Sequence, residues 1–379
     1  MGQVKIKVMK NSTIDSKDLS QDNQAPVLVG LNSAELKTLI TELGEKDFRA
    51  KQVQKWIFEK FARSIDEMTD LSKDFRAVLK EKTVLSPNTV IQTQVSRDGT
   101  SKFLIRLADG QTVEAVTIVQ NNHLTACLSS QVGCNVGCPF CATGLSGFRR
   151  NLTEAEIVDQ FLIMQHAVSQ GALKKYTPFD RITHVVFMGM GEPLLNYDAV
   201  LKSIAILNKP IGIGLRRITI STSGILPGIE RLMKEPRDYN LAISLHSGDP
   251  HTRDKLVPIN HKYTLPQLLK SAREYAEKTG RRITFEYTML KGYNSSPEDA
   301  KTLISRLRGI HCHLNLIAYN PVDSPFQAPP RNEILAFQKI IEEAGFTVTI
   351  RGNHGQDDMA ACGQLRLYSN EQILQQVEA

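Results

Sequence analysis

The chain has 379 residues, of which 41% are hydrophobic and 23% charged, and it carries a formal net charge of +6. This composition is ordinary for a globular protein of two or three domains, and no apolar run is long enough for a transmembrane helix. The polar start predicts no secretory signal, and six cysteines in so long a chain do not suit a disulfide framework, so we expect a cytoplasmic protein.

The first 88 residues predict a polar tail followed by a small helical domain. Residues 1–25 lack periodicity and are expected to be disordered. In residues 26–88, apolar side chains recur at helical spacing, which predicts helices after Asn32, near Phe48–Ala62 and over Ser72–Lys82. Lys and Arg residues are mixed with these positions, so this is either an RNA-contacting accessory domain or a helical unit with a solvated charged face. The basic net charge is compatible with RNA but is weak support alone.

Residues 89–122 predict a short antiparallel β unit that links the helical domain to the rest of the chain. Asp98-Gly99 and Asp109-Gly110 separate three β-prone runs. An Asp-Gly pair between such runs is a strong hairpin signal, so we expect two tight turns here.

Residues 123–352 alternate between strand-like and helical segments, which predicts an α/β fold with a parallel sheet. The expected strands are Leu124–Ser129, Thr183–Met188, Arg217–Ser221, Asn240–Leu245, Ile283–Leu290 and His313–Ala318, and the helices between them are Thr153–Ser169, Asp198–Leu207, Leu226–Lys234, Leu265–Lys278 and Glu298–Leu307. Six units fit a partial (βα)6 barrel, to which Phe346–Arg351 could add a strand, with residues 353–379 as a C-terminal segment. Functional side chains are expected at the C-terminal ends of the strands.

Three cysteines follow the first predicted barrel strand with the spacing CxxxCxxC, at Cys134, Cys138 and Cys141. Three thiolates in one loop can hold an iron–sulfur cluster and leave one iron without a protein ligand. A structural zinc site is the alternative, but zinc usually takes four ligands in two separated pairs, and the sequence offers no second pair. The spacing therefore predicts a cluster with an open iron, as in the radical S-adenosylmethionine (SAM) enzymes.

Other candidates lie at the ends of later predicted strands. In the motif Gly189-Met-Gly-Glu192, the glycines permit close backbone approach and Glu192 could hold the ammonium group of a bound amino acid; the alternative is a tight turn with a helix-start Glu. Ser221-Thr-Ser-Gly224, Ser244-Leu-His246 and Asn320-Pro321 supply polar groups that could bind ribose or carboxylate oxygens, but each is also ordinary turn chemistry.

Two further cysteines have an ambiguous role on chemistry alone. Cys127 lies at the expected barrel mouth, and Cys362 has small neighbours that leave it open to approach. A thiolate nucleophile is one interpretation. A small buried hydrophobic residue is the more common fate of a free cysteine, and it is favoured here, as it is for Cys312.

From about Leu31 to Leu367 the chain resembles the RlmN/Cfr family of radical SAM RNA methyltransferases. The resemblance rests on the motifs Phe48-Arg-Ala-Lys-Gln-Val, Cys127-Leu-Ser-Ser-Gln-Val-Gly-Cys-Asn-Val-Gly-Cys-Pro-Phe-Cys141, Met188-Gly-Met-Gly-Glu-Pro193, Ser221-Thr-Ser-Gly224, Ser244-Leu-His246, Tyr319-Asn-Pro321 and Ala361-Cys-Gly-Gln364. It implies a radical SAM barrel with one [4Fe–4S] cluster and two SAM molecules per turnover. It also implies a SAM pocket lined by Gly191, Glu192, Ser221, Ser244, Leu245, His246 and Asn320.

The resemblance moves Cys127 and Cys362 into the catalytic machinery. Cys362 would accept a methyl group from one SAM molecule, and a radical derived from a second would abstract hydrogen from that methyl group. The carbon radical would add to adenine and form a covalent protein–RNA adduct. Cys127 would release the product by forming a disulfide with Cys362, while Glu114 accepts the ring proton. The family usually has an acidic residue at position 359, where this chain has Met359.

The resemblance also implies the substrate and the partners. The RlmN side of the family methylates carbon 2 of an adenosine in the peptidyl-transferase region of 23S rRNA and the adenosine 3′ to the anticodon in tRNA. We expect this activity, with a flavodoxin- or ferredoxin-type electron donor and a monomeric enzyme that does not bind membranes. The alternatives are carbon-8 methylation of the Cfr type, a radical SAM enzyme with a small-molecule substrate, and a non-catalytic, metal-stabilised RNA-binding module.

Overall fold

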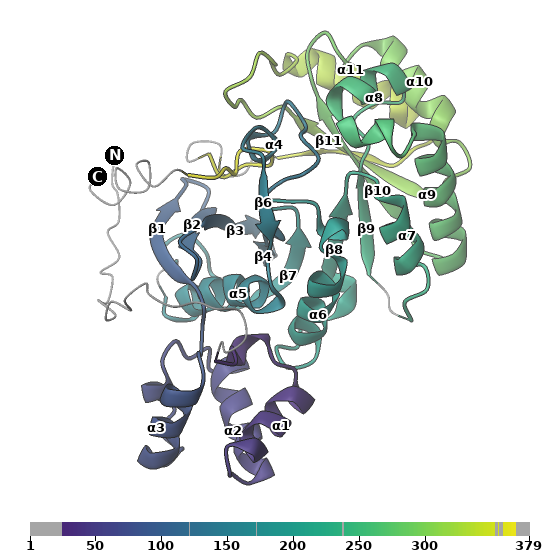
Figure 1. Ribbon diagram of the computed structural model, residues 1–379. Helices are drawn as coiled ribbons and strands as arrows, with labels where there is room; N and C mark the ends of the chain where they lie inside the picture. Colours follow the sequence, from purple (N-terminus) through teal and green to yellow (C-terminus); the bar gives the residue numbers. More distant parts are fainter. Residues whose placement is uncertain are drawn as a thin grey trace.

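One ten-stranded sheet runs through the chain, in the order β1-β2-β3-β4-β7-β8-β9-β10-β11-β12. The computed structural model describes residues 25–120, 122–171, 173–236, 239–352, 355 and 359–368 (Figure 1). The tail predicted over residues 1–25 lies, except for residue 25, outside the described residues, as does most of the segment 353–379. Among the described helices, none combines the length and apolar character that crossing a bilayer demands.

The parallel part of the sheet confirms the predicted partial barrel. Its strands are β4 (His123–Cys127), β7 (Ile182–Phe187), β8 (Ile218–Thr222), β9 (Asn240–Ser244), β10 (Ile283–Met289), β11 (Cys312–Ala318) and β12 (Val348–Arg351). They are connected through α5 (Glu154–Ser169), α6 (Tyr197–Asn208), α7 (Leu226–Leu232), α9 (Leu265–Thr279), α10 (Pro297–Leu307) and α11 (Arg331–Glu343). Side chains such as Ile220, Ile243 and Phe285 are fully buried, as expected for strands that helices cover.

The predicted antiparallel unit continues this same sheet. It consists of β1 (Thr89–Val95), β2 (Ser101–Arg106) and β3 (Thr112–Gln120), and Gly99 and Gly110 have the positive φ angles that its turns require. Strand β3 pairs antiparallel with β4, so that Val116 lies opposite Cys127. The unit therefore brings its own side chains to the first strand of the barrel.

The N-terminal helices α1 (Ser33–Glu42), α2 (Asp47–Phe58) and α3 (Lys73–Lys82) lie beyond α5, at one end of the sheet (Figure 1). Helix α2 ends at Phe58, before the predicted Ala62, and the chain turns away at Phe61, which has a left-handed backbone with φ 56°. An ion pair with a fully buried carboxylate joins this domain to α5: Arg63 Nη1 lies 2.5 Å from Asp159 Oδ1, and the Ser86 hydroxyl donates to Asp159 Oδ2 at 2.6 Å. Because removing one partner of a buried pair is costly, these contacts fix the domain against the barrel.

The remaining elements are short. They are the hairpin β5 (Gln131–Gly133) and β6 (Phe148–Asn151), the helices α4 (Ala142–Leu145) and α8 (Pro250–Leu256), and the 3-10 helices Leu28–Gly30, Ile65–Glu67, Pro193–Leu195, Leu215–Arg217 and Pro258–His261. Helices α8 and α11 were not predicted, although Ile334, Phe337 and Ile341 are buried on α11 at helical spacing.

Candidate active site

The three cysteines of the CxxxCxxC motif lie on one loop between β5 and α4. The loop closes where the Cys134 N–H donates to Gly147 O at 3.0 Å. Gly133 has φ +76°, and a Cβ atom there would lie 1.8 Å from Gly147 O. Only glycine fits this position, since a side chain would both strain the backbone and displace the opposite strand of the hairpin.

The cysteine loop fits an iron–sulfur cluster. Its three thiols are free and half-buried, and they pack against an apolar group formed by Val136, Phe140, Leu256, Val257, Leu290 and Tyr319. Burial raises the pKa of Cys134 to about 12 and that of Cys138 well above its usual value, so bound iron would be needed to hold these groups as thiolates. Within the described residues, no three Cys, His, Asp or Glu side chains converge on a single metal ion. The thiolates that hold a cluster need not converge in this way, because each bonds a different iron.

Gly189 and Gly191 approach the protein's own backbone closely. A Cβ atom on Gly189 would lie 2.7 Å from the Leu128 carbonyl carbon, and one on Gly191 would lie 2.5 Å from Gln131 Cβ. The close approach predicted from the sequence therefore packs the end of β7 against the loop that follows β4.

The Glu192 carboxylate is buried and already hydrogen-bonded. Glu192 Oε2 accepts from the Ser223 N–H at 2.6 Å and the Ser223 hydroxyl at 2.7 Å, and Oε1 accepts from the Leu194 N–H at 3.0 Å. Burial nevertheless raises its pKa above the ordinary value. Glu192 thus both begins a helical turn, as in the alternative interpretation, and presents a carboxylate at the ends of β7 and β8.

The Ser221, Ser244 and Leu245 positions lie at the ends of β8 and β9, where a buried arginine connects the strands. Arg253, fully buried on α8, donates to Leu245 O at 3.1 Å, to Ser244 O at 3.3 Å and to Ser223 O at 2.6 Å. Sequence reasoning missed this residue because α8 itself was not predicted.

His246 is held as a neutral imidazole. The Thr288 N–H donates to His246 Nδ1 at 3.0 Å, and burial together with the charge of Arg253 lowers the pKa of His246 to about 3. The proton of the neutral ring is therefore on Nε2, which makes His246 a hydrogen-bond donor at the mouth of the barrel.

The C-terminal segment 359–368 crosses the mouth of the barrel beside α4 (Figure 1). It is held on one side by Asn320, whose Nδ2 donates to Cys362 O at 3.0 Å. On the other side the Ala142 N–H donates to Gly363 O at 2.8 Å, and the Thr143 hydroxyl donates to Leu365 O at 2.5 Å. The segment thereby joins the end of β11 to the cysteine loop.

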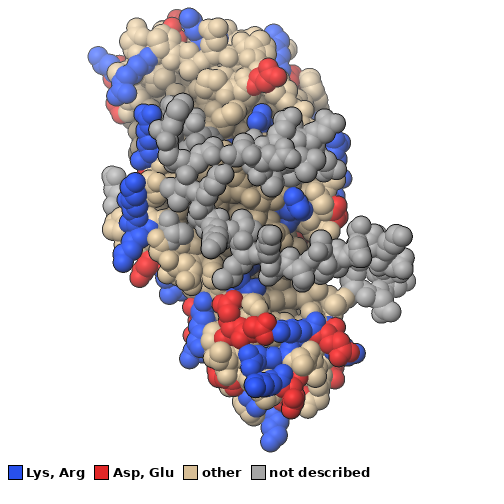
Figure 2. Space-filling view, turned by 90° about the vertical axis from the view of Figure 1, so that its left-hand side faces the viewer, with Lys and Arg blue, Asp and Glu red and all other residues tan. Residues whose placement is uncertain are grey.

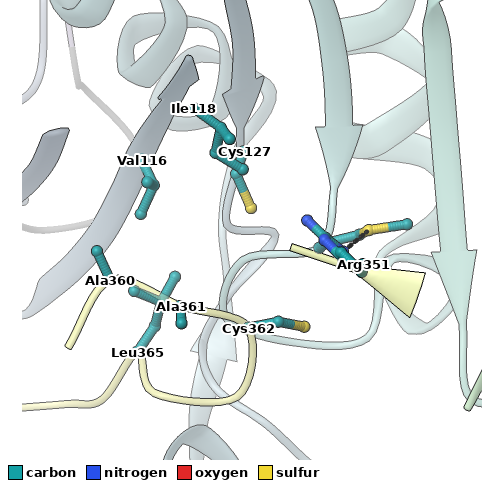
Figure 3. Close-up of a pocket in the computed structure, with 9 residues that line it drawn as sticks. Val116, Ile118, Cys127, Arg351, Ala360, Ala361, Cys362 and Leu365 are labelled. Carbon is teal, nitrogen blue, oxygen red and sulfur yellow. Dashed lines mark hydrogen bonds between the residues drawn. The ribbon is translucent and has the colours of Figure 1, made fainter. Parts of the chain in front are cut away.

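Cys127 and Cys362 meet in one pocket at this place (Figure 3). The pocket is also lined by Val116, Ile118, Met188, Arg351, Ala360, Ala361 and Leu365. Both thiols are free. Burial raises the pKa of Cys127 to about 12. Cys362 is exposed as a residue, but protein atoms surround its thiol closely enough for desolvation to raise its pKa, an effect that Arg351 opposes.

Glu114 lies on β3 with its carboxylate fully enclosed by three donors. Lys102 Nζ lies 3.1 Å from Oε1, the Tyr368 hydroxyl donates to Oε1 at 3.1 Å, and the Arg366 N–H donates to Oε2 at 2.8 Å. Lys102 also donates to the carbonyl of Met359 at 3.3 Å, whereas Asp357 and Asp358 lie outside the described residues. Glu114 therefore anchors the segment that carries Cys362. Lys102 and Tyr368 were missed from the sequence, because a lone lysine or tyrosine gives no signal of a long-range contact.

Comparisons with known proteins show which family this chain resembles. A family model described as the ribosomal RNA large subunit methyltransferase N-terminal domain matches residues 27–85, and the radical SAM superfamily model matches residues 128–304. The chain is 47% identical to the "Probable dual-specificity RNA methyltransferase RlmN" of Thermotoga neapolitana, over 90% of this chain and 97% of the relative. It is 47% identical to the "Dual-specificity RNA methyltransferase RlmN" of Magnetococcus marinus, over 89% and 94%. The crystal structure of a radical SAM methyltransferase from Sphaerobacter thermophilus matches with a TM-score of 0.85 and 41% identity, over 90% of this chain and 99% of the other.

Proposed function

Because the chain belongs to the RlmN family of radical SAM RNA methyltransferases, we propose that it methylates carbon 2 of adenosine in the peptidyl-transferase region of 23S rRNA and 3′ to the anticodon in tRNA. The observation that carries this proposal is the shared pocket of Cys127 and Cys362 beside the cysteine loop. Methyl transfer through a protein thiol needs a carrier and a second thiol to release it, and these residues bring both to one place.

Cys134, Cys138 and Cys141 would hold one [4Fe–4S] cluster, which when bound supplies the electron that cleaves SAM. The SAM site would lie at the neighbouring strand ends. There Glu192 offers a carboxylate and His246 an Nε2 donor, and the other proposed contacts are Gly191, Ser221, Ser244, Leu245 and Asn320. Two SAM molecules would be used per turnover, one as methyl donor and one as radical source.

The pocket residues would act in sequence. The Cys362 thiolate forms a sulfur–carbon bond to the methyl group while the bond from that carbon to the sulfonium of SAM breaks, and its thiol proton has gone to solvent. One hydrogen atom of this methyl group would pass to the 5′-deoxyadenosyl radical from the second SAM, and the carbon radical would then bond to carbon 2 of adenine. The unpaired electron left on this adduct would return to the oxidised cluster. Glu114 accepts the proton from carbon 2. The Cys127 thiolate then attacks the Cys362 sulfur, so that a disulfide forms as the bond from Cys362 to the new methyl carbon breaks. The electron pair of that bond stays on the carbon attached to adenine, which takes up a proton to complete the methyl group.

The helical domain over residues 26–88 would contact the RNA. Phe48 is 50% exposed on α2, near Lys51 and Lys55, and an exposed aromatic among basic residues suits stacking on an unpaired base. Figure 2 shows Asp and Glu interspersed with Lys and Arg over the lower part of the molecule, so charge alone would not select RNA there.

We propose that the chain is organised into structural units at residues 26–88, 89–122, 123–352 and 353–379. We also propose that its electron donor is of the flavodoxin or ferredoxin type, and that the enzyme is monomeric and cytoplasmic.

The test is an anaerobic assay with reconstituted protein, SAM, dithionite and protein-free 23S rRNA, followed by digestion and mass spectrometry. We expect 2-methyladenosine together with 5′-deoxyadenosine. 8-Methyladenosine would instead support the Cfr-type activity. A protein that forms neither product would contradict the radical SAM proposal and favour a non-catalytic RNA-binding role.

A further inference from the structure

Strand β12 carries a charged side chain into the pocket of the two cysteines. Arg351 is the last residue of this strand, which pairs in parallel with β11 beyond the six predicted β–α units. Its side chain lies to the right of Cys127 and Cys362 in the view of Figure 3 and lines the same pocket. Its Nη1 lies 3.8 Å from the sulfur of Met188, another lining residue at the end of β7. Strand β12 thus places a guanidinium group in the pocket at the mouth of the barrel.

The charges around the two thiols come from several elements. Arg351 on β12 favours the ionised form of both thiols, whereas Glu286 on β10 and Cys141 on the cysteine loop disfavour ionisation of Cys362. Glu286 is buried and accepts from Asn315 Nδ2 at 2.8 Å. The neighbouring ion pair of Lys102 and Glu114 holds the segment that carries Cys362.

The positive charge persists in this environment. Burial acts to lower the pKa of Arg351, but the opposing charges of Cys362, Glu286 and Cys127 outweigh it and raise that pKa above its ordinary value. A guanidinium group also stays protonated at every pH relevant to thiol chemistry. An opposite charge in the same pocket as a thiol favours its ionised form, and more so where water is excluded.

We propose that Arg351 is a positioning residue that stabilises the thiolate of Cys362 for methyl transfer and that of Cys127 for release of the product. The inference rests on the proposed function, in which both cysteines react as thiolates. It assigns one residue to two separate steps: the guanidinium favours loss of a proton from each thiol in turn and takes no part in bond making. The opposing interpretation is that Arg351 only neutralises the buried Glu286.

The test measures thiol ionisation directly. Reconstituted holoenzyme is treated anaerobically with iodoacetamide over a range of pH, without SAM, and the alkylation rate of each free cysteine is followed by peptide mass spectrometry. We expect Arg351→Gln to raise the pH midpoint of Cys362 alkylation by about 1 pH unit or more. At a pH below both midpoints, Cys362 of this variant should therefore be alkylated about tenfold more slowly, or slower still, than Cys362 of the unmodified protein. Arg351→Lys keeps a positive charge and should restore part of the shift.

Two internal controls belong to the same experiment. Cys312 lies at the start of β11, where burial raises its pKa to about 11 and the charge of Arg282 opposes part of this shift. Arg282→Gln is therefore the matched substitution, and it should leave the Cys362 midpoint unchanged. Cys312 should in turn keep its own midpoint in the Arg351→Gln protein.

An unchanged Cys362 midpoint in folded, cluster-containing Arg351→Gln protein would overturn the proposal and leave Arg351 as the partner of Glu286. If that variant does not fold, Glu286→Gln tests the same electrostatics with the opposite sign. Removal of the negative charge should lower the Cys362 midpoint, and an unchanged or higher midpoint would overturn the proposal. Failure of the proposed function is separate, since it would appear as RNA methylation by Cys362→Ala protein, whatever the alkylation profiles are.

Discussion

The cysteine loop and the pocket of Cys127 and Cys362 are assembled in opposite ways. The loop is one short stretch of chain, closed by its own backbone and by Gly133, which no other residue can replace without a clash. The pocket takes its walls from β3, β4, β7, β12 and the C-terminal segment. The difference teaches that the loop depends on local backbone geometry, whereas the pocket depends on the pairing and docking of distant elements.

The largest effect is expected from a substitution that alters the pocket and leaves the cysteine loop unchanged. Cys362→Ala should abolish RNA methylation, because the methyl carrier is gone, while iron content and cluster absorption stay at the level of the unmodified protein. Mass spectrometry of the digested RNA measures the loss of methylation, and iron determination measures whether the cluster is retained.

Cys127→Ala should differ from Cys362→Ala in kind. Since the resolving thiol is missing, a covalent protein–RNA adduct should accumulate and persist on a denaturing gel. If RNA migrates free of the Cys127→Ala protein although Cys362 is methylated, the release role of Cys127 is wrong.

The next largest effect is expected from a substitution that alters the cysteine loop and leaves the residues of the pocket unchanged. A Cβ atom on Gly133 would lie 1.8 Å from Gly147 O, so Gly133→Ala should move the hairpin and lose most of the bound iron. Gly137→Ala is the matched control, because Gly137 has φ +73° in the same loop but nothing within 4 Å of an added Cβ. It should cost only about 1 kcal/mol of backbone strain and retain the cluster. Equal iron loss in both variants would show that strain, and not the clash, decides the result.

A smaller effect should come from loosening the pocket at its edge. Asn320→Ala removes the hydrogen bond from Asn320 Nδ2 to Cys362 O, which is worth about 0.5–1.5 kcal/mol. We expect methyl transfer to Cys362 to slow by about two- to tenfold, measured by single-turnover mass spectrometry of the Cys362 peptide. Asn240→Ala removes a hydrogen bond to Arg216 O and one from Arg281 Nη2, at the start of β9 and away from the strand ends that carry the site, and should leave this rate unchanged.

The smallest effect lies away from both regions. His123 and His184 stack at 3.9 Å between ring centroids near the start of β4 and β7, and burial, with the charges of His123 and Arg217, lowers the pKa of His184 from 6.5 to about 4. The unfolded chain therefore binds more protons between these values, so stability is lost as the pH falls from about 6.5 towards 4. We expect the melting temperature to drop over this range, and His184→Asn to reduce the drop by a few degrees, while the contribution of the buried His246 remains. An equally steep dependence in the variant would assign the effect to other groups.

Local sequence patterns predicted much of the fold correctly. Asp98-Gly99 and Asp109-Gly110 marked real turns, and the alternation of strands and helices gave the parallel sheet, because each of these signals depends on neighbours in the sequence. The pairing of β3 with β4 and the added helix α11 were not predicted. Only two residues, Asn121-Asn122, separate β3 from β4, and this pair is a weaker hairpin signal than the Asp-Gly pairs of the other two turns.

The residues of the candidate site likewise fall into two groups, those that local spacing predicts and those whose role depends on contacts between distant segments. The spacing of Cys134, Cys138 and Cys141 was informative by itself, whereas Cys127 and Cys362 gained their roles only from the family resemblance. Arg351 gave no signal, since its importance depends on where β12 ends relative to two distant thiols.

The hydrogen bonds from Ala142 and Thr143 to the C-terminal segment have a thermodynamic consequence. Free energy gained when the cysteine loop becomes ordered also orders the chain around Cys362, and by reciprocity anything that steadies Cys362 tightens the loop. In the proposed function, iron binding by the loop and placement of Cys362 would be linked equilibria, so loss of the metal would also weaken the hydrogen bonds that hold the segment around Cys362.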